Sequence, residues 1–180
     1  MPIKTATLAN GCFWCADAVF RQVKGIREVK SGFTGGAIKN PAYREVVREL
    51  TGHAEAVQLT YDTDVISYKD ILLIFFTTHD PTSLNRQGYD VGTHYRSAIF
   101  YHDEKQKTIA EDTIKALNES TFNHNIVTEI KPATAFYEAE NYHQDFYRRN
   151  TEYPYCQVVI NPKIQKLRQY FADKIKPINV

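Results

Sequence analysis

Near its N-terminus the chain reads Leu8-Ala9-Asn10-Gly11-Cys12-Phe13-Trp14-Cys15. The residues up to Asn10 predict a short β-strand over 3–10, and Gly11 is the turn residue that follows it. From Cys12 onward apolar residues recur at helical spacing as far as Gly25. The motif is therefore strand, glycine turn, cysteine and helix. This unit is typical of proteins in which strands and helices alternate.

The rest of the chain continues this alternation. Strand patterns cover 26–33, 53–61, 96–101 and 126–130, and helical patterns follow Asn40-Pro41, begin at Ser67-Tyr68-Lys69-Asp70, cover 103–118 and 141–149, and follow Asn161-Pro162. The alternation predicts an α/β (α+β) fold with a mixed sheet covered by helices. We find no repeat, low-complexity tract or linker, so we expect one domain over 1–180. Its segment 150–180 carries Cys156 and a final helix.

Composition excludes several classes of protein. The 180 residues suffice for one well-filled core, and a net charge of +1 gives no reason to expect nucleic acid or an anionic membrane as partner. No run of 18 apolar residues predicts a membrane span, and the start, Met1-Pro2-Ile3-Lys4, shows no targeting segment. We therefore expect a cytoplasmic protein with reduced thiols. Cys12, Cys15 and Cys156 are then catalytic, metal-binding or buried rather than a structural disulfide framework.

Cys12 has the features of a nucleophile. A cysteine in the first turn of a helix lies beside unpaired backbone N–H groups and the positive end of the helix dipole. Both favour the thiolate, so we expect a lowered pKa. The alternative is a small buried hydrophobic residue, which is the commonest fate of an isolated cysteine. The position at a helix start beside Cys15 makes that alternative the weaker one.

Three interpretations of Cys12-Phe13-Trp14-Cys15 compete. A thioredoxin-like dithiol would have this spacing. A zinc site would need two further ligands, such as Cys156 and a histidine, but no second Cys-x-x-Cys or paired-histidine motif is present. The third interpretation is a thiolate that attacks a substrate directly, with Phe13 and Trp14 as an apolar wall beside it. Ordinary core packing is the alternative role for both aromatic residues.

Glu55 lies in the alternating segment Thr51-Gly52-His53-Ala54-Glu55-Ala56-Val57. In that register its carboxyl falls on the apolar face of a strand, where a charged carboxylate is strongly disfavoured. Burial would raise its pKa and keep a proton available near neutrality, as a general acid requires. A misjudged register would instead put Glu55 in water. For His53 we expect a structural hydrogen bond.

The segment Gln87-Gly88-Tyr89-Asp90-Val91-Gly92-Thr93-His94-Tyr95-Arg96-Ser97 concentrates glycines with polar and aromatic residues ahead of a strand. That combination is typical of a binding loop.

Five motifs together closely resemble the A-type peptide-methionine sulfoxide reductases. They are Gly11-Cys12-Phe13-Trp14, Gly32-Phe33-Thr34-Gly35-Gly36, Asn40-Pro41-Ala42-Tyr43, Gly52-His53-Ala54-Glu55 and Gly92-Thr93-His94-Tyr95-Arg96-Ser97. The similarity runs in the right order from about residue 6 to residue 101, and more loosely to about residue 150 through Tyr142-His143-Gln144. Ordered agreement across separate motifs is far more specific than Cys-x-x-Cys alone.

The resemblance implies a single catalytic domain with a ferredoxin-like (α-β plait) core, and it implies roles for particular residues. Those roles are nucleophile for Cys12, methyl-pocket walls for Phe13 and Trp14, proton donor for Glu55, oxygen-binding hydroxyls for Tyr43 and Tyr95, and a contact to the substrate backbone for Asp90. It also implies an oxidoreductase for the S epimer of free or peptide-bound methionine sulfoxide. No metal or organic cofactor is implied; the reductant is an external thiol, thioredoxin or dithiothreitol.

The chain departs from the resemblance at the second thiol. Resolving cysteines of such enzymes often lie in a glycine-rich tail, whereas Tyr153-Pro154-Tyr155-Cys156-Gln157-Val158-Val159-Ile160 has no glycine. Cys156 is the resolving candidate, Cys15 is its rival one helical turn from Cys12, and direct reduction of Cys12 by an external thiol is the third possibility. We expect a monomer. The competing functions are a thioredoxin-like disulfide oxidoreductase, which needs no buried Glu55, and a zinc- or peptide-binding module.

Overall fold

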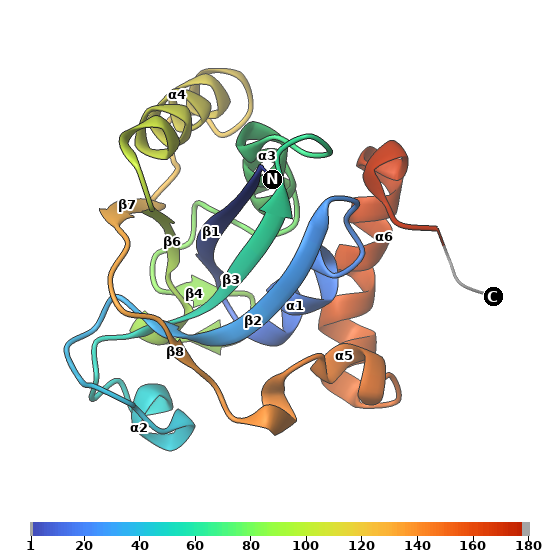
Figure 1. Ribbon diagram of the computed structural model, residues 1–180. Helices are drawn as coiled ribbons and strands as arrows, with labels where there is room; N and C mark the ends of the chain where they lie inside the picture. The colour runs from blue at the N-terminus through green and yellow to red at the C-terminus, as the bar shows by residue number, and fades with distance from the viewer. Residues whose placement is uncertain (1, 178–180) are drawn as a thin grey trace.

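The structure is a computed structural model that describes residues 2–177. Its centre is a six-stranded sheet in the order β7-β6-β1-β3-β2-β8 (Figure 1). The strands are β1 (Ile3–Asn10), β2 (Ile26–Thr34), β3 (Ala54–Asp62), β6 (Ser97–Tyr101), β7 (Glu129–Pro132) and β8 (Tyr137–Glu138). The β6–β7 pair is parallel and the other pairs are antiparallel, so the sheet is mixed, as predicted. A separate hairpin pairs β4 (Arg86–Gln87) with β5 (Asp90–Val91).

Within the described residues, α-helices accompany the sheet. They are α1 (Phe13–Phe20), α2 (Tyr43–Val47), α3 (Tyr68–Thr77), α4 (Glu104–Ser120), α5 (Phe146–Arg149) and α6 (Asn161–Tyr170). Helix α1 packs on β2 and β3 and contacts α5 and α6, while α4 packs on α3 and β6 (Figure 1). The predicted mixed sheet with helices is thus confirmed. The narrower ferredoxin-like core stays a prediction, which the central order β6-β1-β3-β2 supports.

Alternation along the central strands produces two unequal cores. Leu8, Val57 and Leu59 belong to the large core shared with the helices. Ala9 and Ala56 belong to a small second cluster that packs against Ala133 and Phe136. Because successive side chains of a strand point to opposite faces, β1 directs the chain into α1 on the side of the large core. Cys12, between β1 and α1, therefore starts its helix against the main core.

Two predicted helix boundaries are wrong. Helix α1 ends at Phe20 rather than at Gly25, because Val23 leaves the helix and forms a β-bridge with Ile175. Helix α2 is capped by Ala42 rather than Asn40, whose φ is +47°. Leu50 is 69% exposed and lies beyond the helix end. Local apolar spacing predicted more helix than tertiary contacts support.

The C-terminal third also differs in detail. The predicted helix over 141–149 is broken, because Asp145 takes φ +52° between a short 3₁₀ turn (Asn141–His143) and α5. Helix α6 begins at Asn161, close to the predicted start, but the π-helical turn Cys156–Ile160 leads directly into it, so Asn161 is already a helical residue rather than a cap. The strand predicted from 126 begins at Glu129. Segment 141–160 thus places more side chains near α1 than one short helix would.

Candidate active site

The turn between β1 and α1 requires glycine. Gly11 has φ +104°, and a Cβ atom there would lie 2.7 Å from Cγ of Gln87. Cys12 follows as the N-cap residue of α1 in an extended conformation, and its carbonyl accepts the Cys15 N–H at 3.0 Å. Its side chain is only 8% exposed. The thiol therefore sits at a helix start, as predicted, but is almost fully buried.

That burial overturns the expected lowering of the Cys12 pKa. Burial holds the pKa of the Cys12 thiol well above its usual value, and the hydrogen bond with Cys15 and the nearby Glu55 add to the effect. The backbone N–H of Trp14 acts in the opposite direction, as the helix start predicts, but is outweighed. These effects favour the thiol over the thiolate at neutral pH.

Glu55 lies where the strand pattern predicts, on the buried face of β3 and 1% exposed. Its Oε1 accepts the Phe13 N–H at 3.1 Å, which joins β3 to the first turn of α1. Within residues 2–177 its Oε2 is buried and has no hydrogen-bond partner. Burial raises the pKa of Glu55 to about 8, against the lowering effect of the Phe13 bond. At neutral pH the carboxyl keeps its proton, with one oxygen free for another molecule.

Tyr43 and Tyr95 come from separate parts of the chain, the start of α2 and a 3₁₀ turn before β6. Burial raises the pKa of both phenols, and for both the next causes are charges at Glu55 and Cys12. The Tyr43 ring lies 6.2 Å from that of Phe13. The fold therefore gathers two protonated phenols around the Glu55–Cys12 pair.

Trp14 is half-buried and is held by residues from the distant segment 141–155. Its indole N–H donates to Nδ1 of His143 at 3.0 Å, and its ring stacks on Phe146 with centroids 3.8 Å apart and planes 5° apart. Tyr153 and Tyr155 contact it edge-on. Because His143 Nδ1 accepts a hydrogen bond, its hydrogen is on Nε2. Nε2 is buried and, in the described chain, unpartnered.

Sequence reasoning missed His143, Phe146 and Tyr155. Tyr142-His143-Gln144 belongs to the similar motifs and could have indicated His143, but the sequence alone predicts no role for it. Phe146 and Tyr155 carry no local signal, since their place follows from tertiary packing alone.

Cys15, Tyr155 and Asp90 form a hydrogen-bonded chain. The Tyr155 hydroxyl donates to Oδ2 of Asp90 at 2.5 Å and lies 3.4 Å from Sγ of Cys15. Since the phenol hydrogen goes to Asp90, the Cys15 thiol is the donor to Tyr155. The hydrogen bond with Cys12 lowers the pKa of Cys15 even though burial opposes it.

Cys156 is fully buried in the π-helical turn next to Tyr155. Burial raises its pKa, and the nearby Cys15 raises it further. All three cysteines are free thiols in the structure, with Cys15 near both of the others.

His53 makes structural hydrogen bonds, as expected. Its Nδ1 accepts the Gly36 N–H at 2.9 Å, so its Nε2 donates to the Ile38 carbonyl at 2.7 Å. In the part of the chain that the structure describes, no three His, Cys, Asp or Glu side chains gather in an arrangement able to hold a metal ion. No helix within 2–177 has the length and apolar character needed to cross a bilayer.

Comparison with known proteins identifies the family. The sequence pattern of the family described as peptide methionine sulfoxide reductase matches residues 4–175. The chain belongs to this family. A peptide methionine sulfoxide reductase of Saccharolobus solfataricus is 53% identical over 174 residues, covering 97% of this chain and 98% of that protein. One from Thermus thermophilus is 48% identical over 177 residues, covering 98% of this chain and 100% of that protein.

Solved structures of the family agree. Reduced Mxr1 from Saccharomyces cerevisiae superposes with a TM-score of 0.81 at 33% identity, covering 86% of this chain and 90% of that one. Methionine sulfoxide reductase A of Corynebacterium diphtheriae gives 0.74 at 31%, covering 83% and 76%. Mxr1 in complex with Trx2 gives 0.58 at 27%, covering 81% and 85%. The chain is therefore a methionine sulfoxide reductase, an oxidoreductase that acts on sulfur.

Glu55→Gln should slow the reduction step by at least about 100-fold, the lower range for loss of a general acid. Binding should change far less, because the proton matters most in the transition state. Single-turnover kinetics measure both quantities, and Glu28→Gln on the exposed part of β2 is the control. An unchanged rate of Cys12 sulfenic acid formation, with only apparent affinity altered, would contradict the role of Glu55.

The same variant should change how stability depends on pH. The folded-state pKa of Glu55, about 8, lies above its usual value of 4.5. The folded protein therefore binds this proton more tightly, and its contribution to stability is lost as pH rises from about 4.5 to about 8. Glu55→Gln should gain on wild type by up to ~1.4 kcal/mol per pH unit in that window. Urea unfolding at pH 5, 6.5 and 8 tests this; a constant difference would contradict burial as the cause.

Proposed function

We propose that Cys12 attacks the sulfur of methionine sulfoxide while Glu55 protonates its oxygen. The observation that carries the proposal is the buried, neutral Glu55 with one unpartnered oxygen, bonded to the residue that follows Cys12. Sulfoxide sulfur is a poor electrophile until its oxygen is protonated or strongly hydrogen-bonded. Neutral Glu55 with the phenols of Tyr43 and Tyr95 supplies three donors in a site that excludes water.

The step balances without another reactant. Attack first joins the Cys12 sulfur to the substrate sulfur. That sulfur–sulfur bond and the sulfur–oxygen bond of the substrate then break as the oxygen passes to Cys12, so methionine leaves as the thioether and Cys12 becomes a sulfenic acid. Sulfur of the substrate is reduced and sulfur of Cys12 is oxidised. Glu55 delivers its proton to the oxygen, and the Cys12 thiol proton restores the neutral carboxyl. This exchange suits a resting pair in which both groups are protonated.

The substrate that we propose is the S epimer of methionine sulfoxide, free or within a peptide. Phe13 and Trp14 would enclose the methyl group, since both rings lie beside Cys12 in the chain and pack in the aromatic cluster with Tyr43 and His143. Asp90 would contact the substrate backbone. Its bond to Tyr155 uses one carboxylate oxygen and leaves acceptor capacity for an amide N–H.

For recycling we propose that Cys15 acts first and Cys156 second. Cys15 attacks the sulfenic acid, the oxygen leaves as water with the thiol proton, and a Cys12–Cys15 disulfide results. Cys156 then attacks Cys15 and frees Cys12. Three observations support this order. Cys15 is hydrogen-bonded to Cys12, the pKa of the Cys15 thiol is lowered, and Cys15 lies near enough to Cys156 to raise the pKa of that thiol. A disulfide inside the first turn of a helix would strain the backbone, and this strain is eased here because Cys12 is an extended N-cap rather than a helical residue.

Cys156 needs movement to expose the final disulfide. The π-helical turn Cys156–Ile160 that precedes α6 is the segment that would rearrange, and such turns often mark functional positions.

We further propose thioredoxin as the reductant, without metal or organic cofactor. The complex of the similar yeast Mxr1 with Trx2 supports this partner. Residues 1–180 would act as a single catalytic domain, a monomer in the cytoplasm, where reduced thiols such as these three persist.

Purified protein with dithiothreitol should consume only the S epimer when given separated R and S sulfoxides. Cys12→Ser should abolish this turnover, because an alcohol at this site is too weak a nucleophile. Product chromatography measures both. Substantial activity in Cys12→Ser would remove Cys12 from its role, and equal consumption of the epimers would contradict the proposed substrate.

Cys156→Ser should keep single turnover and dithiothreitol-driven activity but lose most thioredoxin-driven activity, since thioredoxin attacks a disulfide whereas dithiothreitol reaches the sulfenic acid itself. Cys15→Ser should behave likewise and accumulate the sulfenic acid. In wild type given one equivalent of substrate, thiol blocking and peptide mass spectrometry should find Cys12–Cys15 early and Cys15–Cys156 later. A final Cys12–Cys15 bond with Cys156 still alkylatable would overturn the role of Cys156 and leave the reductase function untouched.

A further inference from the structure

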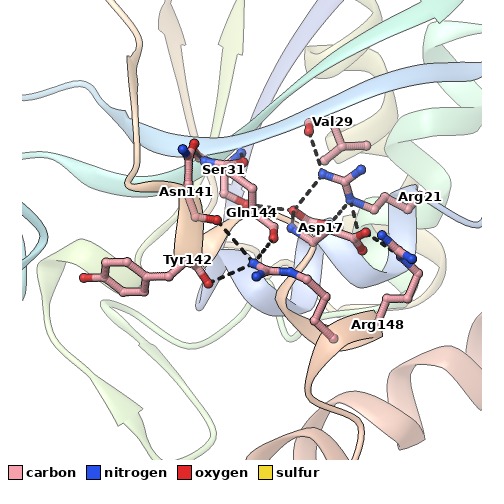
Figure 2. Close-up of polar contacts among 10 residues, drawn as sticks. Asp17, Arg21, Val29, Ser31, Asn141, Tyr142, Gln144 and Arg148 are labelled. Atoms are coloured by element: carbon pink, nitrogen blue, oxygen red, sulfur yellow. Dashed lines mark hydrogen bonds and ion pairs between the residues drawn. The ribbon is translucent and has the colours of Figure 1, made fainter.

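Asp17 is a buried carboxylate that the proposed chemistry does not use. It lies on α1, 1% exposed, five residues after Cys12. Arg21 forms an ion pair with it, and the Ser31 hydroxyl donates to its Oδ2 at 3.1 Å. The backbone N–H of Asp145 donates to the same oxygen at 3.1 Å. One carboxylate therefore joins α1, β2 and the segment 141–149 (Figure 2).

Two neighbouring residues, Gln144 and Asp145, make further contacts that hold segment 141–149 against β2 and α1. The Gln144 side chain pairs with the backbone of Ser31, accepting from its N–H and donating to its carbonyl, both at 2.8 Å. Arg21 also reaches Asp145 at 3.6 Å, and Arg148 bonds to Asp145 at 2.6 Å. Figure 2 shows Asp17 and Arg21 facing Ser31 and Gln144 across this junction. The left-handed Asp145 is thus fixed at a defined place against α1.

The fixed point lies between the two residues that hold Trp14. His143, two residues before Asp145, accepts the indole N–H, and Phe146, one residue after, stacks on the ring. Trp14 itself lies on α1, three residues before Asp17. A displacement of Asp145 would move both partners of Trp14 together, because the chain that joins them is short and runs through Asp145.

We infer that Asp17 is a positioning residue that sets substrate affinity through Trp14, by anchoring Asp145 between His143 and Phe146. The inference rests on the proposed role of Trp14 as a wall of the methyl pocket. A carboxylate in this place carries a burial cost, since burial raises its pKa despite its donors. Anchoring the pocket wall to the nucleophile's own helix is a function that offsets such a cost.

The test uses Asp17→Asn, which keeps the side-chain shape but removes the charge that pairs with Arg21. Trp14 is the sole tryptophan of the chain, so its fluorescence reports directly on the packing of the wall. We expect a red-shifted emission and easier quenching by acrylamide without substrate. We also expect KM for free methionine sulfoxide to rise about tenfold while the single-turnover rate at saturation changes less than about twofold.

Arg21→Gln and Arg27→Gln form a matched pair of milder variants. Arg21 pairs with Asp17, whereas Arg27, near the start of β2, pairs with Asp62 at the end of β3 at 2.9 Å. Arg21→Gln should change the Trp14 spectrum and KM in the same direction as Asp17→Asn, by about threefold in KM. Arg27→Gln should change neither. This pair also carries the test if Asp17→Asn fails to fold.

An unchanged Trp14 spectrum in folded Asp17→Asn or Arg21→Gln would overturn the inference, as would a loss confined to the single-turnover rate. A shifted spectrum with unchanged KM would instead overturn the pocket role of Trp14 and leave the anchoring intact. Failure of the inference and failure of the proposed function are therefore told apart.

Discussion

The hydrogen bond from the Phe13 N–H to Glu55 connects the middle of the sheet to the start of the catalytic helix. Its geometry depends on strand register, because β3 pairs with β1 on one side and β2 on the other, with Glu55 opposite Phe33. A shift of one residue would turn Glu55 to the other face and leave Cys12 without an acid. One bond is enough to place the carboxyl but too little to stabilise its charge. Burial consequently decides its protonation, and the acid stays neutral near pH 7.

Burial keeps both Glu55 and Cys12 protonated, but this has opposite consequences for their reactivity. A neutral Glu55 is ready to donate, whereas a neutral Cys12 is a weak nucleophile. Desolvation raises both pKa values, and the helix start at Cys12 is too small an effect to reverse it. Glu55 and Cys12 are therefore both neutral before substrate binds, which in the proposed mechanism suits an uncharged sulfoxide. In that mechanism charge separation begins only after the substrate has filled the site, when donors for its oxygen are already in place.

Sequence was sufficient where the determinant is local. The alternation of β3 predicted the burial of Glu55, and the glycine turn before Cys12 predicted the start of α1. The sequence was insufficient where a property depends on how deeply a side chain is buried or on contacts between distant segments. The raised pKa of Cys12 depends on everything that covers it, including residues far away along the chain. Phe146 contacts Trp14, and Tyr155 contacts Cys15, only because segment 141–160 folds back over α1. The helix break at Asp145 that permits this fold could not be predicted, because the left-handed position is occupied by aspartate rather than glycine.

A thioredoxin-like enzyme and this one would share the same Cys-x-x-Cys at a helix start, so the surroundings must separate the two functions. A disulfide oxidoreductase needs a thiol that is exposed to another protein, and here Cys12 is 8% exposed among aromatic side chains. It has no use for a buried acid, and Glu55 carries the cost of burial. Cys15 resembles a thiol of a dithiol site more closely, since its pKa is lowered. Its thiol donates to the Tyr155 hydroxyl, which in turn donates to Asp90. In the proposed mechanism two cysteines therefore divide what a thioredoxin-like site combines: Cys12 reacts with the small substrate, and Cys15 passes the oxidation to the segment that carries Cys156.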